Sequence, residues 1–266
     1  MFNRMQSQAT FQEDLSFLIP DQQINSMPVE IRELCEAYNS DCTQPADNDA
    51  ALKSDWPVSL FVPRQYEENY AYPLLIWFHD NHSSENELNL VMNGIGDQNY
   101  CGLAIRGNSQ LDEHDSFGWK PGEFECGSIP LDELVNVTAR RLRRAFHIHS
   151  ERIFAAGSGA GADIAMKLFA ENPQWFAGAI LIESDCATEY NLGDPTELRG
   201  KHVLQTISKT ASNSVLAQNL ASVRVLRSAG VDIDVRVTDE PIDPCSNETR
   251  FIDNWLMSRL NCETYV

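Results

Sequence analysis

One stretch of the sequence decides the fold. Residues 152–166 read Arg-Ile-Phe-Ala-Ala-Gly-Ser-Gly-Ala-Gly-Ala-Asp-Ile-Ala-Met. The apolar run Ile153–Ala156 is typical of a buried strand, and it leads into a turn made of small residues. The spacing of apolar residues in Ala160–Glu171 predicts a helix directly after the turn. A strand, a tight turn and a helix in this order predict one unit of an α/β sheet.

Strands and helices alternate on both sides of this unit. The other predicted strands are Trp56–Val62, Tyr72–His79, Tyr100–Ile105, Trp175–Glu183, Lys201–Ile207 and Ile233–Val237. The other predicted helices are Glu85–Gly94, Pro130–Phe146, Ser212–Ala229 and Asn247–Leu260. This alternation predicts a mostly parallel central sheet with helices on both faces. In such sheets ligands bind at the carboxyl ends of the strands, so the loops at that edge are where a functional site is expected.

The length of the chain fits one such domain. Its 266 residues lie within the range that a single α/β sheet occupies. Residues 1–54 show no clear sheet period and are interpreted as an N-terminal extension, while residues 55–266 form the α/β domain. The extension has too few apolar residues for a core of its own, so we expect it to pack across the sheet or on a neighbouring subunit.

The charge of the chain excludes some partners. The formal net charge is −19, from 39 Asp and Glu against 20 Lys and Arg, and such a field repels nucleic acid and anionic membranes. The basic cluster of Arg140, Arg141, Arg143 and Arg144 is interpreted as a solvated helix face. We therefore expect neither nucleic acid nor membrane as a partner, and the oligomeric state stays open.

The termini and the cysteines indicate the compartment. The first residues lack the apolar core of a secretory signal, so a cytoplasmic protein is expected. The seven cysteines are an odd number and include no C-x-x-C pair, which argues against a disulfide framework or a zinc site. We predict no metal and no cofactor.

The turn and three further segments carry a resemblance to a known family. The segments are Tyr72–Asp80, Asn172–Ile180 and Ser228–Ile233, in the order and spacing of that family. The chain resembles the α/β-hydrolases, in particular their phospholipase/carboxylesterase and dienelactone-hydrolase-like esterases. Their nucleophile elbow, G-x-S-x-G, lies between a strand and a helix. The resemblance covers about Trp56 to Leu260 and implies the α/β-hydrolase fold.

The resemblance also assigns the catalytic positions, and each holds an unsuitable residue. The elbow glycines align with Gly157 and Gly161, which puts Gly159 at the nucleophile position. The acid aligns with Ala211, and the base falls in the loop of Ile242, while no histidine follows His202 anywhere in the sequence. A serine without an oriented imidazole and carboxylate is a poor nucleophile, so the three roles fail together.

The oxyanion loop departs from the family as well. The strand that ends in His-Gly in the family ends here in His79 and Asp80. A carboxylate beside a developing oxyanion opposes catalysis. We therefore expect a non-catalytic hydrolase-fold protein, a pseudoenzyme, that binds a small molecule in the vestigial cleft or a protein partner.

Two alternatives stay open at this point. In the first, the protein is a carboxylesterase or phospholipase-like serine hydrolase whose displaced nucleophile is Ser158, with His82 or His202 as the base. In the second, His79, His82 and Glu85 form a metal site, although histidines at this spacing are common outside metal sites. His202 begins its strand and so lies at the wrong end of the sheet for a base.

Overall fold

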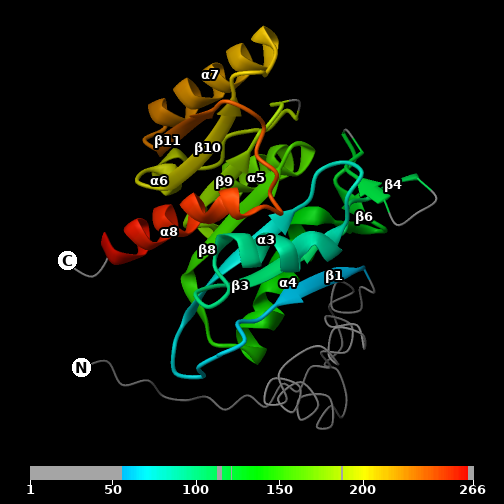
Figure 1. Cartoon of the computed structure of the whole chain (residues 1–266), viewed down its shortest axis with the longest axis vertical. Helices are drawn as coiled ribbons and strands as arrows, with labels where there is room; N and C mark the ends of the chain where they lie inside the picture. The colour runs from blue at the N-terminus through cyan, green and yellow to red at the C-terminus, as the bar shows by residue number, and fades with distance from the viewer. Residues whose placement is uncertain (1–55, 113–115, 121, 187, 263–266) are drawn as a thin grey trace.

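The computed structural model describes residues 56–262 except 113–115, 121 and 187 (Figure 1). The predicted N-terminal extension, residues 1–54, lies outside the described residues, so its packing stays a prediction. No described helix is both long and apolar enough to span a membrane.

A seven-stranded sheet forms the centre of the described chain. Its strands, in spatial order, are β1 (Val58–Phe61), β3 (Cys101–Ile105), β2 (Tyr72–Phe78), β8 (Ile148–Ser158), β9 (Gly178–Ile182), β10 (His202–Ser208) and β11 (Asp232–Thr238). Only the edge strand β1 runs antiparallel to its neighbour, and the pairings from β3 to β11 are parallel. The predicted mostly parallel sheet is therefore confirmed.

Helices cover both faces of the sheet (Figure 1). On one face, α3 (Leu88–Ile95) and α8 (Arg250–Cys262) share a core with alternate strand residues such as Leu75 and Trp77. On the other, α4 (Leu131–Ala145), α5 (Ala160–Glu171), α6 (Pro195–Leu198) and α7 (Asn213–Ser228) pack on the intervening residues, such as Leu74 and Ile76. Successive strand side chains point to opposite faces, so a continuously apolar strand supplies both cores.

Several predicted elements differ in detail from the structure. The predicted helix Glu85–Gly94 is a 3₁₀ turn, η2 (Glu85–Glu87), followed by α3, and the last helix likewise begins with the 3₁₀ turn η4 (Asn247–Thr249). A third 3₁₀ turn, η3 (Pro173–Trp175), precedes β9. Strand β8 begins before the predicted Ile153. Two small hairpins, whose short polar strands gave no apolar signal, were missed: β4 (Ser109–Asp112) with β5 (Ser116–Gly118), and β6 (Glu125–Cys126) with β7 (Ile129–Pro130).

The arginine cluster of α4 is not wholly solvated, contrary to the sequence prediction. Arg140, Arg143 and Arg144 are exposed, but Arg141 is buried, with a relative exposure of 5%. Arg141 lies beside Leu142, about one turn from Thr138 and about two turns from Leu134, which are buried as well. The helix periodicity therefore turns one of the four arginines toward the sheet.

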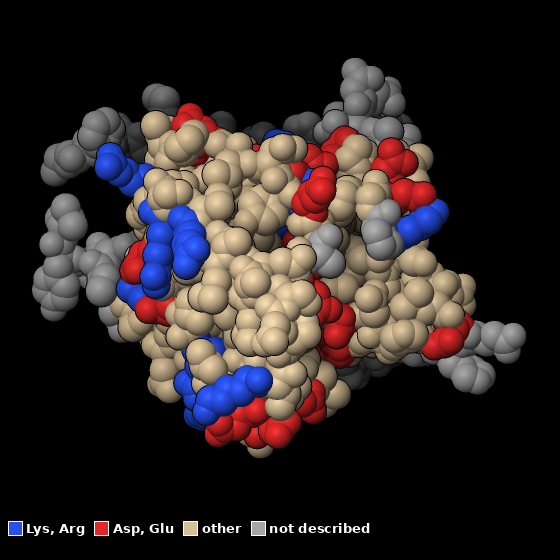
Figure 2. Space-filling model, turned by 90° about the horizontal axis from the view of Figure 1, so that it is seen from above, with Lys and Arg blue, Asp and Glu red and all other residues tan. Residues whose placement is uncertain are grey.

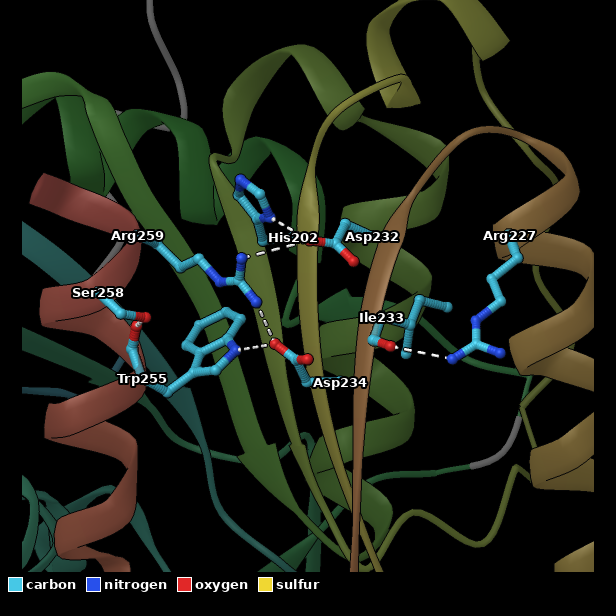
Figure 3. A network of polar contacts seen from close by, with 8 residues as sticks. All are labelled: His202, Arg227, Asp232, Ile233, Asp234, Trp255, Ser258 and Arg259. Atoms are coloured by element: carbon cyan, nitrogen blue, oxygen red, sulfur yellow. Dashed lines mark hydrogen bonds and ion pairs between the residues drawn. The ribbon is translucent and has the colours of Figure 1, made fainter. Parts of the chain in front are cut away.

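A polar network joins α8 to the edge strand β11 (Figure 3). The indole Nε1 of Trp255 donates to Asp234 Oδ2 at 2.7 Å, and the guanidinium of Arg259 pairs with the same oxygen and with Asp232 at 3.3 Å. His202, at the start of β10, lies 3.4 Å from Asp232 through Nδ1. This places His202 at the amino end of the sheet, as the sequence predicted, and far from a site at the carboxyl edge.

The network makes the docking of α8 sensitive to acid. Burial by itself would raise the pKa of the Asp234 carboxyl. The hydrogen bonds from Trp255 and Arg259 lower this pKa by more, so it lies below the ordinary value for an aspartate. A carboxyl whose pKa is lowered by folding stabilises the protein above its unfolded pKa, about 3.9, and this contribution is lost as the pH falls through the folded pKa.

We predict that Asp234→Asn lowers the Tm at pH 7 and that the difference from wild type shrinks below about pH 4. Thermal unfolding followed by circular dichroism at several pH values measures this. Asp97→Asn serves as the control because Asp97 is exposed. An Asp234→Asn deficit that stays constant down to the acid range would contradict the role given to the carboxylate.

Candidate functional site

The turn between β8 and α5 has the backbone of a nucleophile elbow. Gly159 lies at its apex with φ 53° and ψ −122°, which confirms the positive φ predicted for this position. Side-chain-bearing residues with positive φ are confined mainly to ψ of about +30 to +60°, so this conformation is accessible to glycine and strained for other residues. The Gly159 N–H donates to the carbonyl of Ile182 at 2.9 Å, which ties the turn to the end of β9.

The two flanking glycines permit a close approach of backbones. A Cβ on Gly157 would overlap the backbone of Gly161, and a Cβ on Gly161 would overlap the carbonyl of Phe78. Helix α5 therefore begins in direct contact with β8 and with the end of β2. This contact brings the residues that follow β2 to the N-terminus of α5.

The carboxylate of Asp80 lies at the apex of the elbow. Its Oδ1 accepts the backbone N–H of Ala160 at 2.9 Å and that of Asn81 at 2.7 Å. A Cβ built on Gly159 would overlap all three atoms of the same carboxylate. The Asp80 side chain therefore occupies the space into which the side chain of a residue at position 159 would extend.

The interaction has a clear electrostatic origin. Ala160 is the first residue of α5, a helix of 12 residues, and its N–H has no partner within the helix. The N-terminus of a helix carries a partial positive charge, so a carboxylate there is stabilised by the dipole and by the hydrogen bond. In serine hydrolases of this architecture, the N–H of the residue after the nucleophile belongs to the oxyanion hole. Asp80 binds that donor itself.

His79 fixes the end of β2 from which Asp80 extends. Its Nε2 accepts the N–H of Gly107 at 2.8 Å, and its Nδ1 donates to the Asp80 carbonyl at 2.7 Å. Trp119 in turn donates through Nε1 to the His79 carbonyl at 2.7 Å. Burial lowers the pKa of the imidazole, in agreement with a neutral ring that both accepts and donates. His79 is thus a structural residue that orients Asp80.

The remaining aligned positions also have structural roles. Ala211 closes the turn after β10, where its N–H donates to the Ser208 carbonyl at 3.2 Å, and the next residue, Ser212, caps α7. Ile242 is 7% exposed and packs in the core beneath α3 and α8. Both follow the carboxyl ends of their strands, as Gly159 does, but neither brings an acid or a base to that edge.

Ser158 and His82, the fallback candidates, lie in different environments. Ser158 is 5% exposed and follows Phe154 and Ala156 at a spacing of two, so its side chain points toward the core beneath α3 and α8. The His82 side chain is 70% exposed and its Nδ1 lies 3.2 Å from Asp112. Catalysis by serine requires the imidazole within hydrogen-bond reach of the hydroxyl. Because Ser158 is buried and His82 is exposed, these environments give no support to a hydrogen-bonded pair of the two side chains.

A second carboxylate at this edge also has partners within the chain. Glu183, which follows β9 with a φ of 51°, accepts the N–H of Ser208 at 2.8 Å and the hydroxyl of Thr206 at 3.2 Å. A positive φ is unusual for a residue with a side chain, and these bonds across β9 and β10 hold it in place. Glu183 is therefore part of the framework of the carboxyl edge.

The surroundings of Asp80 are acidic. Burial raises the pKa of Glu87, which bonds Ser83 and Trp77, and the negative charges of Asp80 and Asp243 raise it further. Figure 2 shows one face of the molecule, on which Asp and Glu are spread over the middle, right and bottom, with a few on the left, and Lys and Arg lie mostly toward the left and bottom. The field at this edge therefore disfavours a second anion.

The residues suggested for a metal site have separate partners. Glu85 is buried and pairs with Arg106, whose Nε donates at 2.8 Å, while His79 and His82 hold the contacts described above. Among the described residues, no three His, Cys, Asp or Glu side chains are arranged to hold a metal ion.

Cys101, Cys126, Cys186 and Cys245 are free thiols, and burial raises the pKa of Cys126 to about 12.

Comparison with solved structures identifies the fold. The chain is similar to the Bacillus cereus carboxylesterase (TM-score 0.60, 17% identity, 77% of this chain and 95% of that one). It is also similar to a carboxylesterase from Mesorhizobium loti (TM-score 0.55, 21% identity, 71% and 90%) and to a phospholipase/carboxylesterase from Dyadobacter fermentans (TM-score 0.54, 13% identity, 76% and 96%). No family model and no curated protein sequence matches the chain. The protein has the α/β-hydrolase fold.

Sequence reasoning identified Asp80 but missed its role. It treated the residue as a charge opposed to an oxyanion, whereas the structure places its carboxylate in the space at Gly159. A signal was present, because the resemblance aligns Asp80 with a glycine and Gly159 with the nucleophilic serine. This reciprocal exchange of side-chain volume points to contact between the two positions. The role of Glu183 had no comparable signal.

We predict that Gly159 and Asp80 are energetically coupled. Gly159→Ala should destabilise by about 1–3 kcal/mol because of its backbone conformation, with a further loss from overlap with Asp80. Asp80→Gly should destabilise by about 1 kcal/mol because the N-terminus of α5 loses its carboxylate. The double variant should be more stable than the sum of the two changes predicts, by about 0.5–3 kcal/mol, because the overlap is gone. Urea unfolding of the four proteins measures the coupling.

The matched control for this cycle is Gly200→Ala. Gly200 also has a positive φ, 77°, but a Cβ there would meet nothing within 4 Å. Combined with Asp80→Gly, it should be additive to within about 0.3–0.5 kcal/mol. Equal additivity for Gly159→Ala would show that Asp80 does not occupy the elbow.

Proposed function

We propose that this protein is a non-catalytic member of the α/β-hydrolase fold that acts by binding. The observation that carries the proposal is the Asp80 carboxylate at the elbow, bound to the Ala160 N–H and overlapping the space of a side chain at Gly159. A substrate oxyanion at this donor would have to displace a carboxylate of the protein and would meet its charge.

The other aligned positions support the proposal. Gly159 offers no nucleophilic atom, Ala211 no acid and Ile242 no base, and no histidine follows His202 in the sequence. Members of a catalytic triad act as a unit, so a single remaining polar group near the elbow is not expected to retain useful activity. The neighbouring esterases show the fold only, since function depends on the site.

The same features limit what the carboxyl edge binds. Asp80 and Glu183 already accept hydrogen bonds from the backbone, and Glu87 lies in the field of Asp80 and Asp243. Carboxylate or phosphate ligands are therefore disfavoured there, and a neutral or cationic ligand or a protein surface is favoured. No nucleic-acid or membrane partner is proposed, because of the net charge of −19.

A cytoplasmic location is part of the proposal. Cys101 and Cys126 are buried and Cys186 and Cys245 partly buried, all as free thiols. Free thiols persist in a reducing compartment, whereas secreted proteins usually pair them.

Activity measurements test the proposal directly. The purified protein should hydrolyse short-chain p-nitrophenyl esters no faster than a matched blank, and a fluorophosphonate probe should not label it, because Gly159 offers no hydroxyl at the apex of the elbow. Gly159→Ser should remain inactive, since the new hydroxyl lacks a base.

The Ser158→Ala variant is the matched control. Turnover by the wild type that disappears in Ser158→Ala would replace the proposal with a displaced-nucleophile esterase. Turnover that survives in Ser158→Ala but disappears in Asp80→Ala would show that the carboxylate is itself catalytic, and it would equally overturn the proposal.

A further inference from the structure

The edge strand β11 leaves one of its sides unpaired by any described strand. It is the last strand in the order of the sheet, seven residues long, without proline and in unbroken register with β10. Natural proteins usually protect such edges by shortening them, twisting them or adding lysine or proline. Val235 and Val237 are 37% and 59% exposed, so this strand also presents apolar side chains.

The hydrogen-bond pattern shows which residues face outward. The Asp232 N–H donates to Lys201, and the Thr238 carbonyl accepts from Lys209, both at 2.9 Å, so the even-numbered residues bond toward β10. The N–H and C=O groups of Ile233, Val235 and Val237 therefore point away from the sheet. In agreement, the Arg227 side chain reaches the Ile233 carbonyl at 3.2 Å from the outer side (Figure 3).

The side chains of β11 are complementary to a second copy of the same strand. In an antiparallel pair about a two-fold axis, outward-facing residues must pair with outward-facing residues. The register centred on Val235 pairs Ile233 with Val237 and places Asp234 opposite Arg236, twice by symmetry. It uses the outward backbone groups of Val235 and Val237 and the Ile233 N–H. The Ile233 carbonyl, which already accepts from Arg227 at 3.2 Å, would accept a second bond through its other lone pair. The register also joins the three apolar side chains in one stripe.

The neighbouring registers are less complementary. A shift to a centre on Asp234 places Asp232 opposite Arg236 but sets the two Asp234 carboxylates against each other, and a shift to a centre on Arg236 sets two arginines against each other. Like charges directly opposite each other on two paired strands destabilise the pairing, whereas opposite charges at such positions stabilise it. Arg236 is exposed and its guanidinium stacks on Phe251, 4.2 Å from the ring centre, which holds its charge on the face of the sheet where Asp234 lies.

We propose that this protein forms a symmetric homodimer in which the β11 strands of two copies pair antiparallel about Val235 and join the two sheets. The partner is a second copy because the charge pattern of the strand is complementary to itself. This inference does not depend on the proposed absence of catalysis.

Sedimentation or light scattering of the full-length protein tests the dimer. Wild type should have twice the mass of one chain at micromolar concentration. Arg236→Asp should raise the dissociation constant by about tenfold or more, because two attractive pairs become repulsive. Arg236→Lys should keep the dimer, and Arg143→Asp, the same charge change at an exposed site on α4, should leave it unaffected.

Val235→Pro provides a second test with little effect on the sheet itself. The Val235 N–H points outward, so proline there removes no bond to β10 but blocks the pairing of two copies. Circular dichroism checks that the variant is folded, and hydrogen exchange should show the amides of Val235 and Val237 protected in wild type. A monomeric wild type, a dimer that persists in Val235→Pro or Arg236→Asp, or protection of this edge in a monomer would overturn the proposal.

Discussion

The contact between the Asp80 carboxylate and the N-terminus of α5 is the interaction around which the carboxyl edge of the sheet is organised. The first N–H groups of any helix lack partners within the helix, and in a hydrolase of this fold one of them is reserved for a reaction intermediate. Here the donor is Ala160 and the acceptor is the protein's own carboxylate, at 2.9 Å. In this chain the donor at the N-terminus of α5 is therefore bound to a side chain of the protein itself.

Several neighbouring features are consistent with this contact. Gly159 leaves the space that Asp80 fills, and Gly157 and Gly161 bring the end of β2 close enough for Asp80 to reach it. His79, buried and neutral, is bonded on both ring nitrogens and holds the backbone of Asp80 in position. The turn therefore has the backbone shape of an elbow with glycine at its apex. Packing of α5 on the sheet depends on this shape, because Gly157 and Gly161 bring the backbones into direct contact.

The two ends of the sheet differ in character. At the carboxyl end, Asp80 and Glu183 are satisfied by backbone donors, and the charges there add to one another. At the other end, Asp232 and Asp234 are balanced by Arg259, which fastens α8 to the edge strand. The charges of the first arrangement disfavour a further anion, and the second arrangement stabilises the strand whose outer side we propose as the dimer interface.

The sequence by itself determined the order of strands and helices, because apolar periodicity records which residues are buried, and it determined that Gly159 would have a positive φ. Through the family resemblance it also predicted that the nucleophile, acid and base positions hold Gly159, Ala211 and Ile242, whereas it missed the short polar hairpins and wrongly interpreted Arg141 as solvated. Only the tertiary structure decided where the Asp80 carboxylate lies and that Glu183 bonds across two strands. Those contacts join residues distant in sequence, Asp80 with Ala160 and Glu183 with Ser208. Local patterns carry no distance between such residues, since that distance is set by how closely α5 and the strands pack.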